Sequence, residues 1–181
     1  LPEILRRALR HCYTGRPGVV HVDVPEDIMN GTFELQDSWL VPPQNYRCME
    51  ALAPSPSAVG RCLELLAEAK HPLIHAGSGV LHADAMELLA AFAERHHVPI
   101  TTSWAARAAV DERQELAVPM MYVGAVQLAR TDADLVIVLG SRLGESDWWG
   151  KAPRWAPASQ QRLVQVDLEV EGIGNHRPVD L

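Results

Sequence analysis

The stretch from Leu135 to Leu139 limits the possible folds of this chain more than any other feature. Its five residues, Leu-Val-Ile-Val-Leu, are all apolar, so a strand formed here offers no polar face to water. Strands buried on both faces belong to parallel sheets that are covered by helices on either side. A helix expected at about 122–129 precedes the run, and Gly140 ends it. We therefore predict an α/β protein with a parallel sheet and helices on both faces.

The same alternation of strands and helices continues along most of the chain. Short apolar or β-branched runs predict further strands at 19–24, 72–76, 98–102 and 163–167. Apolar residues at helical spacing predict helices at 2–13, from Ser55-Pro56 onward, and at about 82–97. In the last of these, Leu88 and Leu89 are expected to face inward.

Residues 26–56 interrupt this pattern. They show little periodicity and hold several prolines, among them the pair Pro42-Pro43. An irregular stretch of this length is typical of a linker between domains. We therefore divide the chain into residues 1–30 as the end of one domain, 31–54 as a linker and 55–181 as a second domain.

Charge and cysteine content exclude several classes of protein. The chain has 16 basic and 23 acidic residues, a net charge of -7, which argues against binding to the phosphate backbone of nucleic acids. Cys12, Cys48 and Cys62 show no zinc-binding spacing, and an odd, sparse set suits a reducing compartment, so we expect a cytoplasmic protein. No apolar run approaches the ~18–20 residues of a membrane span.

In a parallel sheet, ligands bind at the carboxyl ends of the strands. Gly77-Ser78-Gly79 follows one strand, and glycines there let the backbone approach a phosphate at a helix N-terminus. A classical dinucleotide motif would have a third glycine where this chain has His82, which argues against an NAD site. The alternative is a tight turn with no ligand.

Two further strand ends carry groups that suit a nucleotide. Arg142, in the turn Gly140-Ser141-Arg142, could hold a pyrophosphate, with a surface ion pair as the alternative. Asp167 could accept hydrogen bonds from ribose hydroxyls, with helix capping as the alternative. Three tryptophans, at 148, 149 and 155, share one loop and indicate either an interface or a loop folded over its own core.

Five segments in sequence order resemble thiamine-diphosphate-dependent enzymes. Residues 15–27, GRPGVVHVDVPED, resemble the segment that leads out of their pyrimidine-binding domain. Residues 69–80, AKHPLIHAGSGV, resemble the start of their central domain. The pattern continues through 98–102 (VPITT), 133–143 (ADLVIVLGSRL) and 166–174 (VDL, then IG). The likeness covers nearly the whole chain and is greatest to acetolactate synthases, with benzoylformate decarboxylase and oxalyl-CoA decarboxylase as more distant relatives.

This resemblance implies a Rossmann-like, doubly wound central domain with six strands. That domain binds FAD in acetolactate synthases and ADP in oxalyl-CoA decarboxylase. Carried over residue by residue, the cofactor-binding candidates are Arg16, Gly77, Ser78, Gly79, Thr102, Ser103, Trp104, Gly140, Ser141, Arg142, Asp167 and Leu168.

The chain departs from the flavin enzymes at two places. Residues 120–124 read MMYVG where their loop reads G-M-x-G, and residues 144–146 read GES where they carry acidic and basic residues. An ADP-type site, or no site, therefore stays open beside FAD.

The same resemblance implies that the catalytic groups lie outside this chain. In the family, a glutamate of the pyrimidine-binding domain activates thiamine diphosphate, and a GDG…NN motif holds Mg²⁺ and the diphosphate. Neither is found in these residues. We therefore expect no catalytic and no metal-binding residue here, and a fragment that is inactive alone. Its expected partners are the rest of its parent chain and further copies in a homo-oligomer. The parent would be a lyase or transferase that decarboxylates a 2-keto acid.

Three alternatives remain beside this interpretation. A sirtuin-like NAD-dependent deacylase shares the sheet type and the glycine turn, but it would usually carry a four-cysteine zinc site that three scattered cysteines do not supply. A free-standing FAD- or ADP-binding module, like the FAD domain of an electron-transfer flavoprotein, would bind flavin reversibly. A purely structural domain would bind neither FAD, ADP nor CoA.

Overall fold

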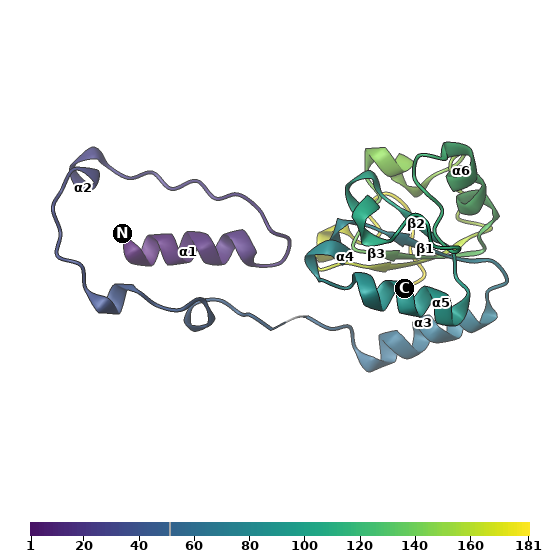
Figure 1. Ribbon diagram of the computed structural model, residues 1–181, viewed down its shortest axis with the longest axis horizontal. Coiled ribbons are helices and arrows are strands. Elements are labelled where there is room, and N and C mark those ends of the chain that lie inside the picture. The colour runs from purple at the N-terminus through teal and green to yellow at the C-terminus, as the bar shows by residue number, and fades with distance from the viewer. Residues whose placement is uncertain (51) are drawn as a thin grey trace. The chain divides into compact units, whose positions relative to one another are not determined.

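The computed structural model describes residues 1–50 and 52–181, which form two compact units, Leu1–Ala53 and Pro54–Leu181 (Figure 1). The second unit contains the sheet. The assignment of residues 1–30 to a preceding domain and of 31–54 to a linker stays a prediction.

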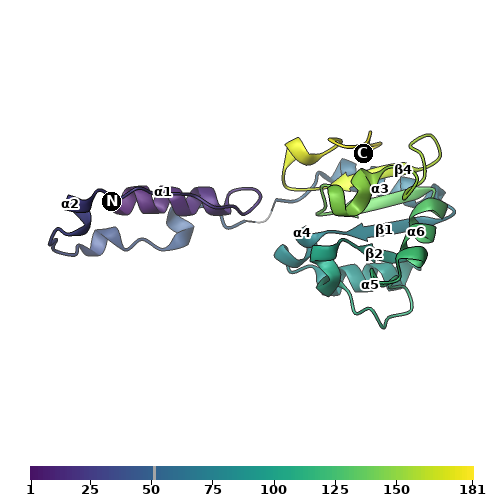
Figure 2. The same ribbon diagram turned by 90° about the horizontal axis from the view of Figure 1, so that it is seen from above.

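Four parallel strands form the sheet of the second unit. They lie in the order β2-β1-β3-β4, with β4, β1 and β2 labelled across the sheet in Figure 2. Their bounds are Pro72–Ala76 (β1), Ile100–Thr102 (β2), Leu135–Leu139 (β3) and Arg162–Val166 (β4). The predicted doubly wound α/β fold is confirmed, since β1 leads toward one edge of the sheet and β3 toward the other.

Short segments extend both edges of the sheet. Beside β2, the backbone N–H of Ile100 donates to Leu116 O (2.8 Å), and that of Val118 donates to Ile100 O (2.8 Å). Beside β4, the N–H of Asp180 donates to Leu163 O (2.8 Å). When these segments are counted, the positions follow the Rossmann order 3-2-1-4-5-6. The described residues therefore form four strands where the resemblance implies six, and only these short segments stand at the two outer positions.

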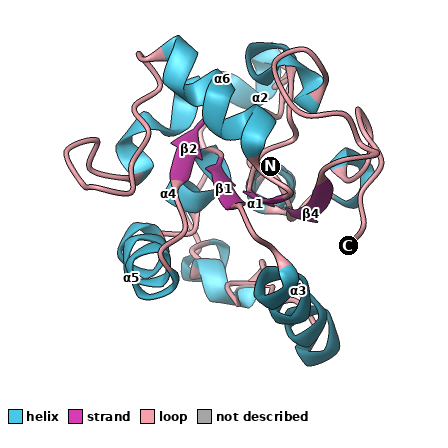
Figure 3. Ribbon diagram, turned by 90° about the vertical axis from the view of Figure 1, so that its right-hand side faces the viewer, coloured by secondary structure: helices cyan, strands magenta, loops and turns pink. Residues whose placement is uncertain are grey.

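Helices cover both faces of the sheet, as Figure 3 shows. On one face, α3 (Pro56–Glu68) and α5 (Met86–His96) bury Leu65 and Leu89 against a core that includes Ile74 and Ile137. On the other face, α6 (Val123–Asp132) and the loop that follows β3 cover the second apolar cluster of the sheet. Its buried members are Leu73, Ala133, Val136, Val138, Leu143, Trp155 and Leu163.

Local hydrogen bonds define where these elements begin. Ser55 caps α3, because its hydroxyl accepts the N–H of Ala58 (3.2 Å). The Asp134 carboxylate accepts the N–H groups of Lys70 (2.8 Å) and His71 (2.9 Å). This carboxylate therefore joins the start of β3 to the start of β1.

The helix expected at about 82–97 forms, but it begins later than predicted, at Met86. The chain forms α4 (Ser78–His82) and then α5, and between them Asp84 adopts a left-handed backbone with φ 51°. Aspartate tolerates this conformation better than most residues, so it allows the chain to turn. Leu89 is buried as expected, but Leu88 is 75% exposed, because α5 buries Leu89 and Ala93 and Leu88 lies on another side of the helix.

The first unit is built differently. It contains α1 (Pro2–Tyr13), α2 (Glu26–Met29) and two short 3₁₀ turns, Asp37–Trp39 and Pro43–Asn45. None of the residues of α1 is buried. Polar contacts hold the helix instead: Arg6 donates to Trp39 O (3.0 Å), and the Arg47 guanidinium lies 4.2 Å from the centre of the Tyr13 ring.

The strand expected at 19–24 does not form. These residues have no regular secondary structure, no strand in the described part of the chain pairs with them, and Val19 is fully exposed. A strand is stable only when a neighbour satisfies its N–H and C=O groups, and β-branched composition alone cannot supply one.

Two observations concern the cysteines and the lengths of the helices. Cys12, Cys48 and Cys62 are free thiols, and the cytoplasmic location stays a prediction. Among the described residues, no helix has both the length and the apolar character needed to cross a membrane.

Candidate functional site

The carboxyl ends of the four strands form one continuous edge. One residue beyond the strands, Gly77 N–H donates to Leu139 O (2.8 Å) and Gly140 N–H to Val166 O (2.8 Å). Ser103 N–H donates to Ala76 O (2.9 Å) in the same way. We call the residues that end or follow the strands here the carboxyl-end rim: 77–79, 102–104, 140–142 and 167–168.

The rim contains all of the predicted cofactor-binding residues except one. Arg16 lies in the first unit, and its part in a site stays a prediction. Two further 3₁₀ turns adjoin the rim, Trp104–Ala109 after β2 and Val170–Gly172 after β4. Parallel strands must end at the same edge, so the sheet topology accounts for this gathering.

The rim glycines are used for packing. A Cβ on Gly77 would lie 2.2 Å from Gly140 O, and one on Gly79 would lie 2.6 Å from Gly140 Cα. The N–H of Gly79 donates to Gly140 O (3.0 Å), and that of Gly77 is also bonded within the sheet. The turns after β1 and β3 therefore cross in direct backbone contact. These two amides do not form a cradle for a phosphate.

The side chains of the rim offer a different set of groups. Arg142 is exposed at the turn after β3, beside the point where the strand order reverses. Asp167 is half-buried, and one of its carboxylate oxygens accepts the N–H of Glu169 (3.1 Å). Ser78 is half-buried, and Trp104 is exposed. A cation, a carboxylate and a hydroxyl fit a phosphorylated sugar better than the glycine turn does.

A buried polar cluster lies beneath the rim on the α6 face. It joins His75 of β1, Arg130 of α6 and Asp147 of the turn Glu145–Gly150, each at most 3% exposed. Asp147 Oδ1 accepts Arg130 Nη2 (3.1 Å), and Asp147 Oδ2 lies 3.3 Å from His75 Nε2. The other ring nitrogen, Nδ1, is 3.1 Å from Thr101 Oγ1.

Trp155 closes this cluster. Its indole N–H donates to Asp147 O (2.7 Å), the Arg130 guanidinium lies 4.5 Å from the ring centre, and His75 meets the ring edge-on at 5.2 Å. The cluster is thus sealed from water on the side of the aromatic ring. Such burial suits a structural role better than proton exchange with a substrate.

Burial and charge set the protonation states here. Burial lowers the pKa of His75 despite the contact with Asp147, so the ring is neutral at neutral pH. Burial alone would raise the pKa of Asp147, but His75 and the Arg130 charge outweigh it and hold the pKa below the ordinary value. With His75 neutral, Arg130 is the cation that keeps Asp147 ionised.

A second buried cation holds the far end of this loop. Arg177 donates to Gly150 O (3.0 Å), to Gln161 O (2.7 Å) and to Gln161 Oε1 (2.7 Å). Gln161 in turn donates to Arg130 O (2.7 Å). The loop after β3 is therefore anchored at both ends by buried polar groups.

The tryptophans of this loop differ in burial, and a part of Trp148 and Trp149 in an interface stays a prediction. Trp155 is buried over its own core. Trp148 and Trp149 are 48% and 41% exposed, with left-handed φ angles of 55° and 53°. Two successive non-glycine residues in this region cost about 1–3 kcal/mol each, so the surrounding anchors must impose the conformation.

Sequence reasoning missed the buried cluster. A histidine inside the apolar strand Pro72–Ala76 was its only local signal, because a buried polar side chain must find a partner. The partner Asp147 comes from a distant loop, and nothing in the local pattern indicates it.

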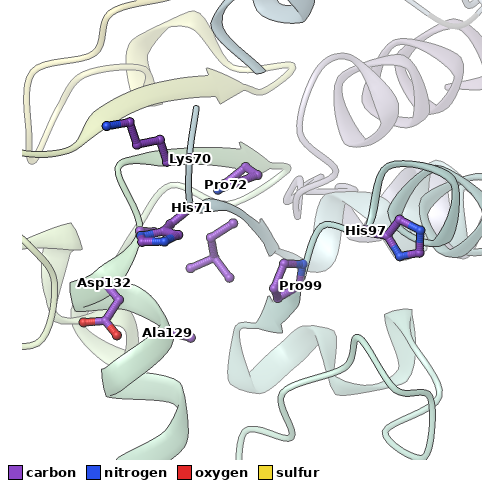
Figure 4. A pocket seen from close by; sticks show the side chains of 9 residues that line it. Lys70, His71, Pro72, His97, Pro99, Ala129 and Asp132 are labelled. Atoms are coloured by element: carbon purple, nitrogen blue, oxygen red, sulfur yellow. The ribbon is translucent and has the colours of Figure 1, made fainter. Parts of the chain in front are cut away.

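One cavity lies at the edge of the sheet opposite the rim. A pocket of about 370 Å³ lies at the amino ends of β1 and β2, the opposite edge of the sheet. In Figure 4, Ala129 and Asp132 reach it from α6, while His97 and Pro99 come from the segment before β2. Within the described ranges, no three His, Cys, Asp or Glu side chains gather to hold a metal ion.

Comparisons with known proteins agree with this topology. The chain is 33% identical over 192 residues to the acetolactate synthase large subunit of Corynebacterium glutamicum, covering 100% of this chain and 29% of that protein. It is 31% identical over 175 residues to the oxalyl-CoA decarboxylase of Escherichia coli K12, covering 97% of this chain and 30% of that protein. The chain thus spans about three tenths of the length of these relatives.

A family model gives the same result for the second unit. Residues 59–181 match the model described as thiamine pyrophosphate enzyme, central domain. The matched range includes the whole sheet and every rim residue. The chain therefore belongs to the thiamine pyrophosphate enzyme family, of which it carries the central domain.

Proposed function

We propose that this chain is the central part of an enzyme that decarboxylates a 2-keto acid and joins the product to a second molecule, as acetolactate synthases do. The observation that carries the proposal is the likeness along the full chain, including the first unit, which lies outside the matched family model. An oxalyl-CoA decarboxylase-like or benzoylformate decarboxylase-like parent is the second candidate, and the similarity to oxalyl-CoA decarboxylase favours the former of these two.

Thiamine diphosphate and Mg²⁺ would be bound by other parts of the whole protein. The thiamine supplies the carbanion chemistry of such enzymes. The buried ions and the sheet of this chain offer no group for that chemistry, since His75, Arg130 and Asp147 are sealed beneath the rim. The role proposed for this domain is to support the neighbouring domains and the contacts of a cytoplasmic homo-oligomer.

We expect the 181-residue chain alone to consume no pyruvate when it is supplied with thiamine diphosphate and Mg²⁺. The groups that activate thiamine lie in other domains of the family, so turnover should stay at the level of the protein-free assay. Proton NMR of the pyruvate methyl signal measures it. The intact acetolactate synthase large subunit of Corynebacterium glutamicum serves as the positive control. Any turnover by the chain above the blank would contradict the proposal.

The reading frame on both sides of this chain tests the class of the parent. An upstream activating glutamate and a downstream GDG…NN motif would support it. A frame that starts near Leu1 and stops near Leu181 would leave nucleotide binding as the remaining function.

We further propose that the carboxyl-end rim binds an adenine nucleotide, ADP or FAD. The supporting observation is the exposed Arg142 beside the reversal of strand order, with the Asp167 carboxylate on the next strand along. Arg142 suits a diphosphate, and Asp167 suits ribose hydroxyls. Gly77, Gly79 and Gly140 allow the turns after β1 and β3 to pack closely against each other.

Replacing Arg142 by Ala should weaken ADP binding roughly 30-fold, because a hydrogen bond to a charged group contributes about 2 kcal/mol. Isothermal titration of the whole chain with ADP, and separately with FAD, measures it. Arg113→Ala is the matched control, since Arg113 is an exposed arginine paired with Asp111 outside the rim. If the unaltered chain binds neither nucleotide, the rim site is refuted and the purely structural alternative stands.

A further inference from the structure

The Asp147 carboxylate contacts the rim from below. Besides Arg130 and His75, it accepts the Ser141 hydroxyl at 3.4 Å. Ser141 belongs to the turn after β3 and is itself buried. One buried carboxylate therefore joins β1, α6 and the rim turn.

Ser141 connects the Asp147 carboxylate to the backbone of the turn. Its hydroxyl oxygen accepts the N–H of Leu143 (3.2 Å), and its carbonyl accepts Gln165 Nε2 (3.1 Å). Gly140 and Leu143 both have left-handed backbones, with φ 61° and 51°. A leucine does not adopt this conformation without support. The Ser141 hydroxyl supplies it, and Asp147 orients that hydroxyl.

Arg142 lies between two buried residues of this turn. Ser141 and Leu143 are 7% and 2% exposed, whereas the Arg142 side chain is in solvent. The direction in which Arg142 leaves the surface is therefore set by its neighbours and by the carboxylate that holds them.

We propose that Asp147 is a positioning residue for the carboxyl-end rim: through Ser141 it holds the turn that presents Arg142 to a bound nucleotide. This proposal rests on the rim site proposed above. Asp147 touches no ligand itself. Its removal should reduce affinity by allowing the turn to move, because a preorganised cation loses less freedom on binding.

Two variants of the whole chain test this role. Asp147→Asn removes the charge, and Ser141→Ala removes the hydroxyl, with both its link to the carboxylate and its bond to the Leu143 N–H. The second variant leaves the Arg130–Asp147 ion pair in place, so it keeps the proposal testable if the first fails to fold. Each should weaken ADP binding about tenfold, the size of a typical coupling between two sites. Each should also speed hydrogen exchange at the Leu143 amide.

A destabilised variant separates positioning from general loss of stability. Leu89→Ala removes a buried side chain from the opposite face of the sheet. Measured well below its melting temperature, it should bind ADP as the unaltered chain does and leave the Leu143 amide protected. An equal loss of affinity in Leu89→Ala would overturn the proposal, and so would unchanged affinity in Ser141→Ala.

A failure of the rim site itself gives a different result. If the unaltered chain binds no nucleotide, the proposed site fails. The rate of hydrogen exchange at the Leu143 amide then remains as the test of whether Asp147 holds the turn. Faster exchange in Asp147→Asn, which keeps the Ser141 hydroxyl, but not in Leu89→Ala would support the hold of Asp147 on the turn. Equal exchange in all three proteins would overturn it.

Discussion

Replacing Arg130 by Met should lower the free energy of unfolding by about 3–5 kcal/mol, the cost of leaving one partner of a buried ion pair without the other. Arg130 is the cation that faces Asp147, at 3.1 Å, and neither side chain is more than 3% exposed. In the unaltered protein burial lowers the pKa of His75, so its ring is neutral and Arg130 supplies the positive charge beside Asp147. Urea denaturation at neutral pH, followed by tryptophan fluorescence, measures the loss.

The pH dependence and a double variant identify the cause. The pKa of Asp147 lies below its ordinary value in the folded protein, so its stabilising contribution is present above the unfolded pKa and is lost as the pH falls. The penalty of Arg130→Met should therefore shrink in acid, where Asp147 becomes protonated. Adding Asp147→Leu should restore much of the stability at neutral pH. A penalty independent of pH, with no recovery in the double variant, would assign the loss to packing against Trp155 instead.

Replacing Gly77 by Ala should destabilise the second unit by about 3 kcal/mol, at the upper end of the range for overpacking. The new Cβ would lie 2.2 Å from Gly140 O and 2.5 Å from Ser141 Cβ. Gly140 is held on both sides, because its N–H donates to Val166 O and its carbonyl accepts the Gly79 N–H, so it cannot withdraw without breaking the crossing. Thermal unfolding followed by circular dichroism measures the loss.

Gly60→Ala is the matched control for this substitution. Gly60 lies inside α3, and a Cβ there would meet nothing within 4 Å. Alanine is the better helix former, so this variant should gain about 0.5–1 kcal/mol. If Gly77→Ala proves as stable as the unaltered chain, the two turns do not cross as closely as described.

The central strands could be predicted because their burial is visible locally. Pro72–Ala76 and Leu135–Leu139 have the expected bounds, and both are apolar runs between turn-forming residues. The gathering of the rim residues also followed, since parallel strands must end at one edge. What those residues meet there could not be predicted, because the contact of Gly77 and Gly79 with Gly140 depends on how closely two turns pack.

Local patterns failed where the deciding partner was distant. Val19 to Val24 have strand composition, but no described strand pairs with them. Leu88 has helical spacing with the core residues, yet α5 buries Leu89 and Ala93 instead and leaves Leu88 in solvent. In both cases the local pattern is present in the sequence. Strand pairing and burial are decided by segments from elsewhere in the chain.

For this protein, composition and periodicity were enough to indicate an α/β fold, its parallel sheet and the edge where its predicted binding residues gather. They report each residue's preference for burial and for helix or strand, which are local quantities. The pairing of His75, Arg130 and Asp147, and the hold of Asp147 on the Ser141 turn, arose only when folding brought β1, α6 and the loop after β3 together. A buried charge is stable only beside its partner, and that partner is chosen in space rather than along the chain.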